Sequence, residues 1–159
     1  MKKIIIGCDN AGVLMKKAII KLLKDEGFLI EEIGVDSEND NTIYPVVAEE
    51  LARRIIKSGY KDEGILVCGT GIGMAIAANK FPGIYAAVCH DIYSAERARL
   101  SNNTNVITFG ARVIGVELAK KLAKEWINLE FKNGSSTPKV DKIKEIEKRL
   151  LTDFITIDK

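Results

Sequence analysis

The feature that most constrains the fold of this chain is a glycine-rich turn near the middle of the sequence. The apolar run at residues 64–68 ends in Cys68, and Gly-Thr-Gly-Ile-Gly-Met follows before a helix-forming run that continues to Asn79. This order predicts a buried strand, a tight turn and the start of a helix. Backbone N–H groups in such a turn lack intrahelical partners, and together with the helix dipole they favour an anion. The sequence therefore predicts an anion-binding turn directly after Cys68.

The glycine spacing excludes two common nucleotide sites. The dinucleotide fingerprint G-x-G-x-x-G would need glycine where the chain has Met74 or Ile76. A Walker loop needs a lysine followed by serine or threonine, and Lys80 is followed by Phe81. We therefore expect the turn to hold a small anion rather than a nucleotide.

Cys68 itself has two main interpretations. Free cysteines are often small buried hydrophobic residues without reactivity. A thiol at a strand end beside unpaired N–H groups can instead become a base or a nucleophile. The first interpretation is the more frequent one for a lone cysteine at a strand end. The glycines weaken it, because they leave the backbone near Cys68 open to a ligand. A redox role is the weakest hypothesis, since no resolving cysteine is near in sequence.

The composition limits the class of protein. A chain of 159 residues that is 47% hydrophobic and 29% charged suits one domain, which we expect at residues 1–151 with a tail at 152–159. A net charge of +2 is too close to neutral to predict a nucleic-acid-binding surface. The apolar runs are too short to predict a membrane span. Without a signal peptide, we expect a cytoplasmic protein. The spacing of Cys8, Cys68 and Cys89 predicts neither a disulfide framework nor a metal site, and we expect no cofactor.

Strand-like and helix-like runs alternate along the chain. Such alternation predicts an α/β fold in which helices cover both faces of a doubly wound, parallel, five-stranded sheet, giving three α/β/α layers and a last, C-terminal helix. The expected strands cover residues 3–8, 29–33, 64–68, 84–89 and 106–109. The expected helices cover residues 14–26, 45–58, 72–79, 93–100, 115–129 and 140–151.

Polar residues follow several of these strands and are expected to meet at one edge of the sheet. Ligands of such sheets bind beyond the carboxyl ends of the strands, near the point where the strand order reverses. Asp9 follows the first strand, where a helix cap and a catalytic role are about equally favoured. His90 follows the fourth strand, and a structural role is the more frequent one for a single histidine there. Arg112 follows the fifth strand and is a candidate phosphate ligand.

Several motifs occur in the order of a known family. They are Gly7-Cys8-Asp9, Cys68-Gly-Thr-Gly-Ile-Gly-Met, Ala77-Ala-Asn-Lys, Cys89-His-Asp-x-Tyr-Ser-Ala, Asn105-Val and Gly110-Ala-Arg-Val-Ile-Gly. With these motifs, residues 2–150 resemble the type B ribose-5-phosphate isomerases, a family that includes the galactose-6-phosphate isomerase subunits. The resemblance implies a Rossmann-like domain and a homodimer, or a tetramer, with sites shared across the interface. It also implies aldose–ketose interconversion of a sugar phosphate without a metal.

The resemblance assigns roles to individual residues. Cys68 would be the base that moves a proton between C1 and C2, and the amides of residues 69–74 would hold the enediolate. Asp9, Tyr44 and Thr70 would line the sugar, while Asn102 and Arg112 match positions often supplied by the partner subunit. The expected catalytic residues are Cys68, Thr70, Asp9 and Ser101. The expected substrate-binding residues are Asp9, Asn10, Tyr44, Gly69, Thr70, Gly71, Ile72, Gly73, Met74, Asn102, Arg112, Ser135 and Lys139.

Three departures from the family pattern affect substrate handling. Asn10 replaces a histidine after Asp9, and Ser101 replaces the histidine that opens the sugar ring. Serine cannot replace an imidazole as an acid near neutral pH. Near the C-terminus, Ser135 and Ser136 stand where the family has arginine and histidine, and of the charged positions there only Lys139 stays charged. The base and the anion turn are retained, whereas ring opening and phosphate binding are weakened.

These features favour an isomerase whose default substrate pair is ribose 5-phosphate and ribulose 5-phosphate. A tetrose 4-phosphate is the first alternative, because it has no free hydroxyl able to close a five-membered ring. It therefore does not need the ring-opening histidine that Ser101 replaces. A hexose 6-phosphate is another alternative. A non-catalytic sugar-phosphate-binding protein is also consistent with the losses, although the retained Cys68 and Asp9 argue against it.

Overall fold

The apolar run before Cys68 forms the central strand of a five-stranded parallel sheet. The computed structural model describes residues 2–157, and the side chains of residues 2–153. The strands are β1 (Lys3–Cys8), β2 (Leu29–Gly34), β3 (Glu63–Cys68), β4 (Ala86–Val88) and β5 (Val106–Gly110), in the order β2-β1-β3-β5-β4. The helices are α1 (Val13–Asp25), α2 (Tyr44–Lys57), α3 (Ile72–Ala78), α4 (Ile92–Asn102), α5 (Val116–Asn128) and α6 (Thr137–Ile157), with the short 3-10 helix η1 (Asn10–Gly12) before α1. The predicted doubly wound α/β fold is confirmed.

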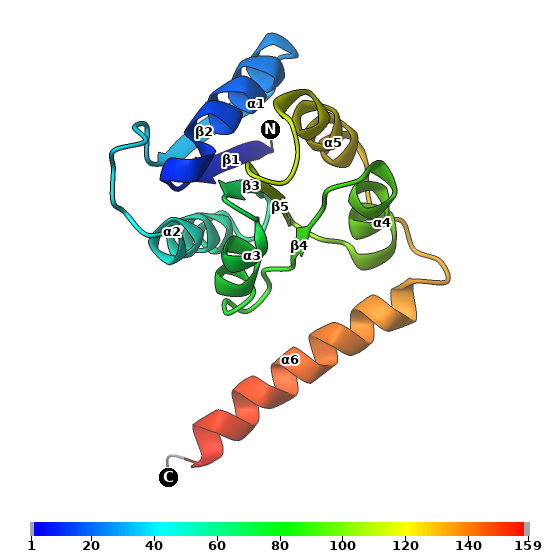
Figure 1. The fold of residues 1–159 in the computed structure, drawn as a ribbon. Helices are drawn as coiled ribbons and strands as arrows, with labels where there is room; N and C mark the ends of the chain where they lie inside the picture. Colours follow the sequence, from blue (N-terminus) through cyan, green and yellow to red (C-terminus); the bar gives the residue numbers. More distant parts are fainter. Residues whose placement is uncertain (1, 158–159) are drawn as a thin grey trace.

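Helices cover both faces of the sheet and create two apolar layers (Figure 1). Helices α1, α4 and α5 pack on one face, and α2 and α3 pack on the other. Alternate side chains of β1 serve the two layers: Ile4 and Ile6 join the first cluster, and Ile5 joins the second. Burial of these chains supplies the main stabilising term, at about 25 cal/mol per Å² of apolar surface removed from water.

The strand order reverses between β1 and β3, which are neighbours in the sheet. From β1 the chain continues to β2 on one side, and the later strands lie on the other side. In sheets of this kind the reversal opens a crevice beyond the carboxyl ends of the strands. Asp9 and Cys68 lie on the two sides of this reversal, at the ends of β1 and β3.

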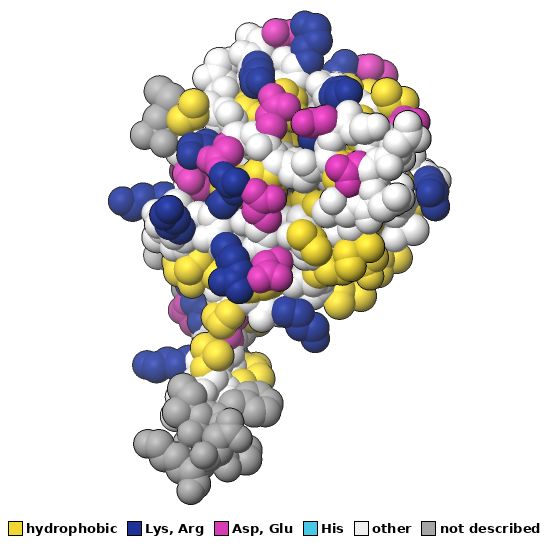
Figure 2. All heavy atoms as spheres, turned by 90° about the vertical axis from the view of Figure 1, so that its left-hand side faces the viewer, with side chains coloured by type: hydrophobic (Ala, Val, Ile, Leu, Met, Phe, Trp, Pro, Cys, Tyr) yellow, Lys and Arg dark blue, Asp and Glu magenta, His cyan; other side chains and the backbone are white. Residues whose placement is uncertain are grey.

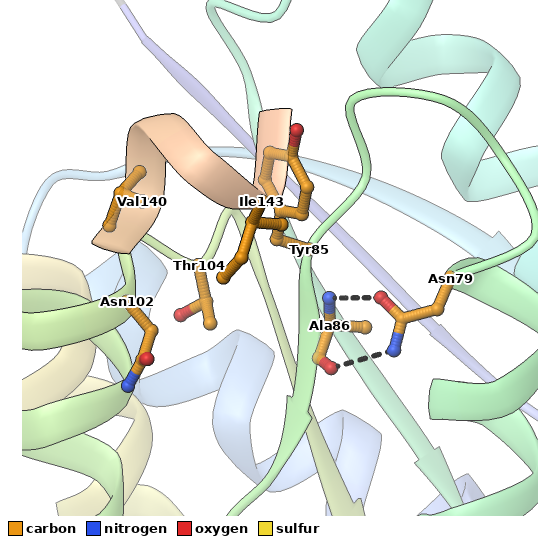
Figure 3. A pocket seen from close by; sticks show the side chains of 7 residues that line it. All are labelled: Asn79, Tyr85, Ala86, Asn102, Thr104, Val140 and Ile143. Carbon is orange, nitrogen blue, oxygen red and sulfur yellow. Dashed lines mark hydrogen bonds between the residues drawn. The ribbon is translucent and has the colours of Figure 1, made fainter. Parts of the chain in front are cut away.

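Strand β4 forms one edge of the sheet and is shorter than the predicted strand at residues 84–89. The N–H of Tyr85 donates to the side chain of Asn105 at 2.8 Å rather than to the backbone of β5. On the same short strand, the side chain of Asn79 pairs with both backbone groups of Ala86, at 2.7 and 2.9 Å (Figure 3). The Asn105 side chain thus takes the N–H that a strand continuing to Tyr85 would use, and the Asn79 side chain pairs with the backbone of the edge strand itself.

Helix α6 is longer than the predicted helix at residues 140–151 and includes residues 152–157 of the predicted tail. Residues 158–159 of that tail lie outside the described part of the chain. The helix projects from the body (Figure 1), although its first turns contact α4 and bury Val140. Glu147 ties it further, since its carboxylate accepts from Gly83 N at 3.0 Å and from the Tyr85 hydroxyl at 3.1 Å. Among the described residues, no helix is both long and apolar enough to cross a membrane.

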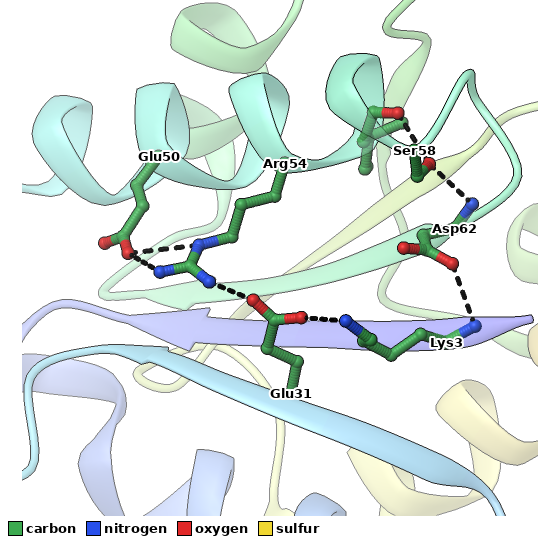
Figure 4. A network of polar contacts seen from close by, with 7 residues as sticks. Lys3, Glu31, Glu50, Arg54, Ser58 and Asp62 are labelled. Carbon is green, nitrogen blue, oxygen red and sulfur yellow. Dashed lines mark hydrogen bonds and ion pairs between the residues drawn. The ribbon is translucent and has the colours of Figure 1, made fainter.

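A charged network ties α2 to the two strands β1 and β2, at the edge of the sheet opposite Cys68 (Figure 4). Lys3 Nζ lies 2.5 Å from Glu31 Oε2, and Arg54 bridges Glu31 and Glu50. Exposed pairs of this kind contribute about 1 kcal/mol or less each. The network therefore adds little to the stability that the apolar layers provide.

Candidate active site

The carboxyl ends of β1 and β3 place Asp9 beside the Cys68 turn. The backbone N–H of Asp9 donates to Val67 O at 3.2 Å, so the residue after β1 is tied to β3. The Asp9 carboxylate accepts from Ala11 N at 3.0 Å and caps η1. The predicted cap is therefore present, and it leaves one carboxylate oxygen available for a second role.

The turn after Cys68 directs a backbone N–H at the cysteine sulfur. Gly71 N donates to Cys68 Sγ at 3.1 Å. This bond depends on the left-handed conformation of Gly71, whose φ is 79° and which side chains other than glycine rarely adopt. Thr70 Oγ1 accepts from Ile72 N at 3.3 Å, and α3 begins at that residue. A hydrogen bond from an N–H group favours the negatively charged form of a thiol.

Tyr44 lies over the first turn of α3. A Cβ built on Gly73 would lie 2.6 Å from the Tyr44 ring and 3.0 Å from its hydroxyl oxygen, so the ring can occupy this place only because residue 73 is glycine. Tyr44 is the first residue of α2, with Pro45 next to it in the first turn. The start of α2 thus brings a phenol to the predicted anion turn.

Lys16 is a buried cation that holds the segment before α2, and sequence reasoning missed it. Its side chain is 1% exposed, and Nζ donates to Val35 O at 2.8 Å and to Asp36 Oδ1 at 2.6 Å. A lysine on the face of α1 is normally expected to point to solvent, so the sequence offers no signal for this contact. The contact fixes the chain as it leaves β2 toward Tyr44.

The turn after β5 places Arg112 against the same site. Ala111 N donates to Cys68 O at 2.8 Å, and Arg112 N donates to Gly69 O at 3.0 Å. A Cβ built on Gly69 would lie 3.6 Å from Arg112 Nη1. Arg112 therefore meets the Cys68 turn of its own chain, although the family pattern often has this position supplied by the partner.

His90 holds that turn from the other side. Its Nε2 accepts from Gly110 N at 3.0 Å. This bond follows the backbone bond from Cys89 N to Thr108 O and extends the pairing of the two segments by one step. An imidazole accepts a hydrogen bond only at an unprotonated nitrogen. The side chain is thus engaged with the backbone, in keeping with the structural role favoured for it.

The titratable groups at this edge have different environments. Partial burial raises the pKa of Asp9 above its ordinary value, and backbone N–H groups and Arg112 partly offset that effect. Burial raises the pKa of Cys8 to about 11 and that of Cys89 to about 12, so both are neutral thiols at pH 7. Cys8 also donates to Val35 O at 3.4 Å, whereas Cys68 accepts from Gly71.

Four predicted site residues lie at the opposite edge of the sheet. Ser101 and Asn102 end α4, which runs away from the carboxyl edge, and Lys139 lies in the first turns of α6. Asn102 lines a cavity of about 170 Å³ with Tyr85, Thr104 and residues of α6 (Figure 3). Ser135 lies in the segment before α6. Within one chain, Ser101, Asn102, Ser135 and Lys139 are therefore not brought to Cys68.

The other predicted residues lie in or beside the turn. Asn10 begins η1 directly after Asp9, and Ile72 to Met74 form the first turn of α3. Among the described residues, no group of three or more His, Cys, Asp or Glu side chains is arranged to hold a metal ion.

Comparisons with known proteins agree with this arrangement. A family model described as Ribose/Galactose Isomerase matches residues 4–143. The chain is 52% identical to a D-erythrulose-4-phosphate isomerase of Pectobacterium atrosepticum, over 90% of this chain and 93% of that protein. It is 47% identical to a ribose-5-P isomerase B of Listeria innocua, over 92% and 98%. The structure of ribose-5-phosphate isomerase B from Mycoplasma genitalium with bound ribulose 5-phosphate is similar, with a TM-score of 0.87 at 34% identity, over 92% of this chain and 96% of that one.

Proposed function

Because the chain belongs to the ribose/galactose isomerase family, we propose that it interconverts the aldose and ketose forms of a small sugar phosphate. The observation that carries the proposal is the Cys68 sulfur, which accepts from Gly71 N at 3.1 Å at the same edge as Asp9 and Arg112. A base next to donors for a developing oxyanion is the arrangement that proton transfer beside a carbonyl group requires.

In the proposed reaction, the Cys68 thiolate removes the proton from C2 of the aldose and leaves an enediolate. Backbone N–H groups of the turn other than that of Gly71, which is directed at Cys68, stabilise the negative oxygen. The thiol then returns the proton to C1 to give the ketose. Asp9, whose pKa is raised by burial, is suited to carry the hydroxyl proton between the two oxygens. Arg112 binds the phosphate as the main cation, and Lys139 of a second copy of the chain is the secondary one.

Ribose 5-phosphate and ribulose 5-phosphate are the first substrate pair that we propose. The relative from Listeria innocua and the ligand in the Mycoplasma genitalium structure support this pair. A tetrose 4-phosphate is the second candidate, because Ser101 supplies no acid for opening a furanose ring. The name of the relative from Pectobacterium atrosepticum supports the tetrose.

The test is a coupled isomerase assay of the wild type and Cys68→Ala on tetrose, pentose and hexose phosphates. We expect turnover of at least one tetrose or pentose phosphate, and a loss of about 10²–10⁴ in kcat in the variant with little change in substrate binding. Cys89→Ala is the matched control, since it removes a buried thiol outside the proposed base position. Near-full turnover by Cys68→Ala would refute the role of the base.

We also propose that the active enzyme is a homodimer whose partner supplies Ser101, Asn102, Ser135 and Lys139. This proposal is supported by their place at the edge opposite Cys68, since a second copy can bring that edge to the site. A second support is the exposed apolar face of α6, where Ile143, Ile146, Leu150 and Leu151 are 39–47% exposed.

Exposed hydrophobic side chains also gather on the body of the molecule (Figure 2). Among the exposed hydrophobic residues of the body are Ile43 and Val46 at the start of α2, and Ile72 and Ile76 on α3, close in sequence to residues of the proposed site. An apolar surface beside an active site suits an interface that completes it. The cytoplasm is the setting that we propose for the enzyme, because free cysteines such as Cys8, Cys68 and Cys89 persist in a reducing compartment.

A further inference from the structure

Thr108 is a buried polar side chain of β5 to which the proposed reaction gives no role. It is 0% exposed, and its hydroxyl donates to Gly71 O at 2.9 Å. The N–H of the same Gly71 donates to Cys68 Sγ at 3.1 Å. We infer that Thr108 is a positioning residue that holds Gly71 in place, so that its N–H stays on the Cys68 sulfur and favours the thiolate. This inference rests on the proposed role of Cys68 as the base.

The backbone of Gly71 is held from three sides. Its carbonyl oxygen accepts from Ala75 N at 3.1 Å within α3, and from Thr108 in the sheet. Its N–H is directed at Cys68. The hydrogen bond from the Thr108 hydroxyl thus ties the start of α3 to β5. Without it, the carbonyl oxygen of Gly71 keeps only its bond from Ala75 N within α3.

The turn also packs directly on β5 at this point. A Cβ built on Gly71 would lie 3.0 Å from the carbonyl carbon of Phe109 and 3.2 Å from Thr108 Oγ1. The close approach lets a short side chain in the sheet reach the backbone of the turn. Valine has nearly the shape of threonine, so Thr108→Val keeps this packing and removes only the hydroxyl. Gly71 O retains its bond from Ala75 N in the variant and is not left unpaired.

The hydrogen bond to Cys68 distinguishes this cysteine from the other two. Cys8 and Cys89 are held as neutral thiols, because burial raises the pKa of the first to about 11 and of the second to about 12. A backbone N–H directed at sulfur stabilises the thiolate and opposes such an effect of burial. Thr108 acts on Cys68 through Gly71, and any loosening of Gly71 makes the thiolate less favourable.

A purely structural role is the competing explanation, since any buried hydroxyl needs a partner. Thr104 provides the matched control, because it is also buried and its Oγ1 accepts from Trp126 Nε1 at 3.0 Å. It lies at the opposite edge of the sheet from Cys68. The titratable and charged groups around the Cys68 turn are Asp9 after β1, Tyr44 on α2, His90 after β4 and Arg112 after β5, and none of them changes in either variant.

The experiment measures the rate at which iodoacetamide alkylates Cys68 between pH 6 and 10, followed by peptide mass, in the full-length protein. It compares the wild type, Thr108→Val, Thr108→Ser and Thr104→Val. We expect Thr108→Val to move the midpoint of the profile up by about 0.5–1 pH unit and to slow alkylation at pH 7 by about three- to tenfold. Thr108→Ser keeps the hydroxyl and should restore the wild-type midpoint. Thr104→Val should lower thermal stability and leave the midpoint unchanged.

The pH–rate profile of isomerisation provides a second readout, with the same alkaline shift and a loss in kcat rather than a rise in KM. A wild-type midpoint in Thr108→Val, no rescue by serine, or an equal shift in Thr104→Val would each overturn the inference. If Thr108→Val fails to fold by circular dichroism, Thr108→Ala takes its place with the same expectation. If no sugar phosphate is turned over, the proposed function fails, while the alkylation profile still decides the role of Thr108.

Discussion

Asp9 combines a structural and a chemical role at the end of β1. Its carboxylate caps η1 through Ala11 N at 3.0 Å, and partial burial raises its pKa above the ordinary value. A carboxyl group whose folded-state pKa is raised stabilises the fold in its protonated form, and this contribution is lost as the pH rises through that pKa. At pH 7 the ionised Asp9 is therefore a small cost to stability that the proposed reaction requires.

Asp9→Asn should separate the two roles. Asparagine keeps an oxygen for the cap and carries no charge. We therefore expect the melting temperature to rise by about 1–3 °C at pH 7 and to equal that of the wild type near pH 3. Turnover should fall by about 10²-fold or more, because the hydroxyl proton loses its carrier. Thermal unfolding at the two pH values and the isomerase assay check this. A variant less stable than the wild type at pH 7 would contradict the expected sign of the change.

Ser101 should limit the enzyme on sugars that are closed rings. Ribose 5-phosphate must open before C2 can lose its proton, and neither Ser101 nor Asn10 titrates near pH 7. We expect Ser101→His to raise kcat on ribose 5-phosphate by about tenfold and to leave erythrose 4-phosphate unchanged. Lys61→His, which adds an imidazole on the exposed surface after α2, is the control. Efficient turnover of the pentose by the wild type, with no gain in the variant, would show that another group opens the ring.

At the scale of elements, alternation and buried runs were enough to predict the sheet, the layers and the edge that Asp9 and Cys68 share. The length of β4 could not be predicted, because the Asn105 side chain takes the backbone N–H of Tyr85, directly before the strand. The C-terminal helix was predicted too short, since α6 continues without a break through residues 152–157 of the expected tail.

The direction of α4 explains why motif order alone misplaces part of the site. A helix that follows a strand in a parallel sheet runs from the carboxyl edge back to the amino edge, so its last residues Ser101 and Asn102 end far from Cys68. The contacts of Thr108 and Lys16 could not be predicted either. Each depends on which backbone carbonyl a buried side chain meets in three dimensions.

At the scale of the whole molecule, one chain holds two incomplete halves of the proposed site. The first half comprises Asp9, Tyr44, Cys68 and Arg112 at the carboxyl edge. The second comprises Ser101, Asn102, Ser135 and Lys139 near the start of α6. A two-fold dimer is self-complementary, so it would join each half to the other half of its partner and complete both sites at once.

Mixing two inactive variants tests this arrangement. We expect Cys68→Ala and Asn102→Ala to be impaired alone, and an equal mixture, unfolded and refolded together, to recover about a quarter of the wild-type sites. The reason is that half of the dimers are mixed, and each mixed dimer has one site with neither substitution. The assay is turnover of the substrate identified by the panel, with light scattering to establish the dimer.

The matched control for this experiment is an equal mixture of Cys68→Ala and Asp9→Asn. Both residues belong to the half-site of a single chain, so every site of a mixed dimer carries one substitution or the other, and no recovery is expected. Recovery of activity in this control would mean that Cys68 and Asp9 of one active site come from different chains. A monomer in light scattering, or a first mixture no more active than the mean of its parents, would place the whole active site within one chain and refute the shared site.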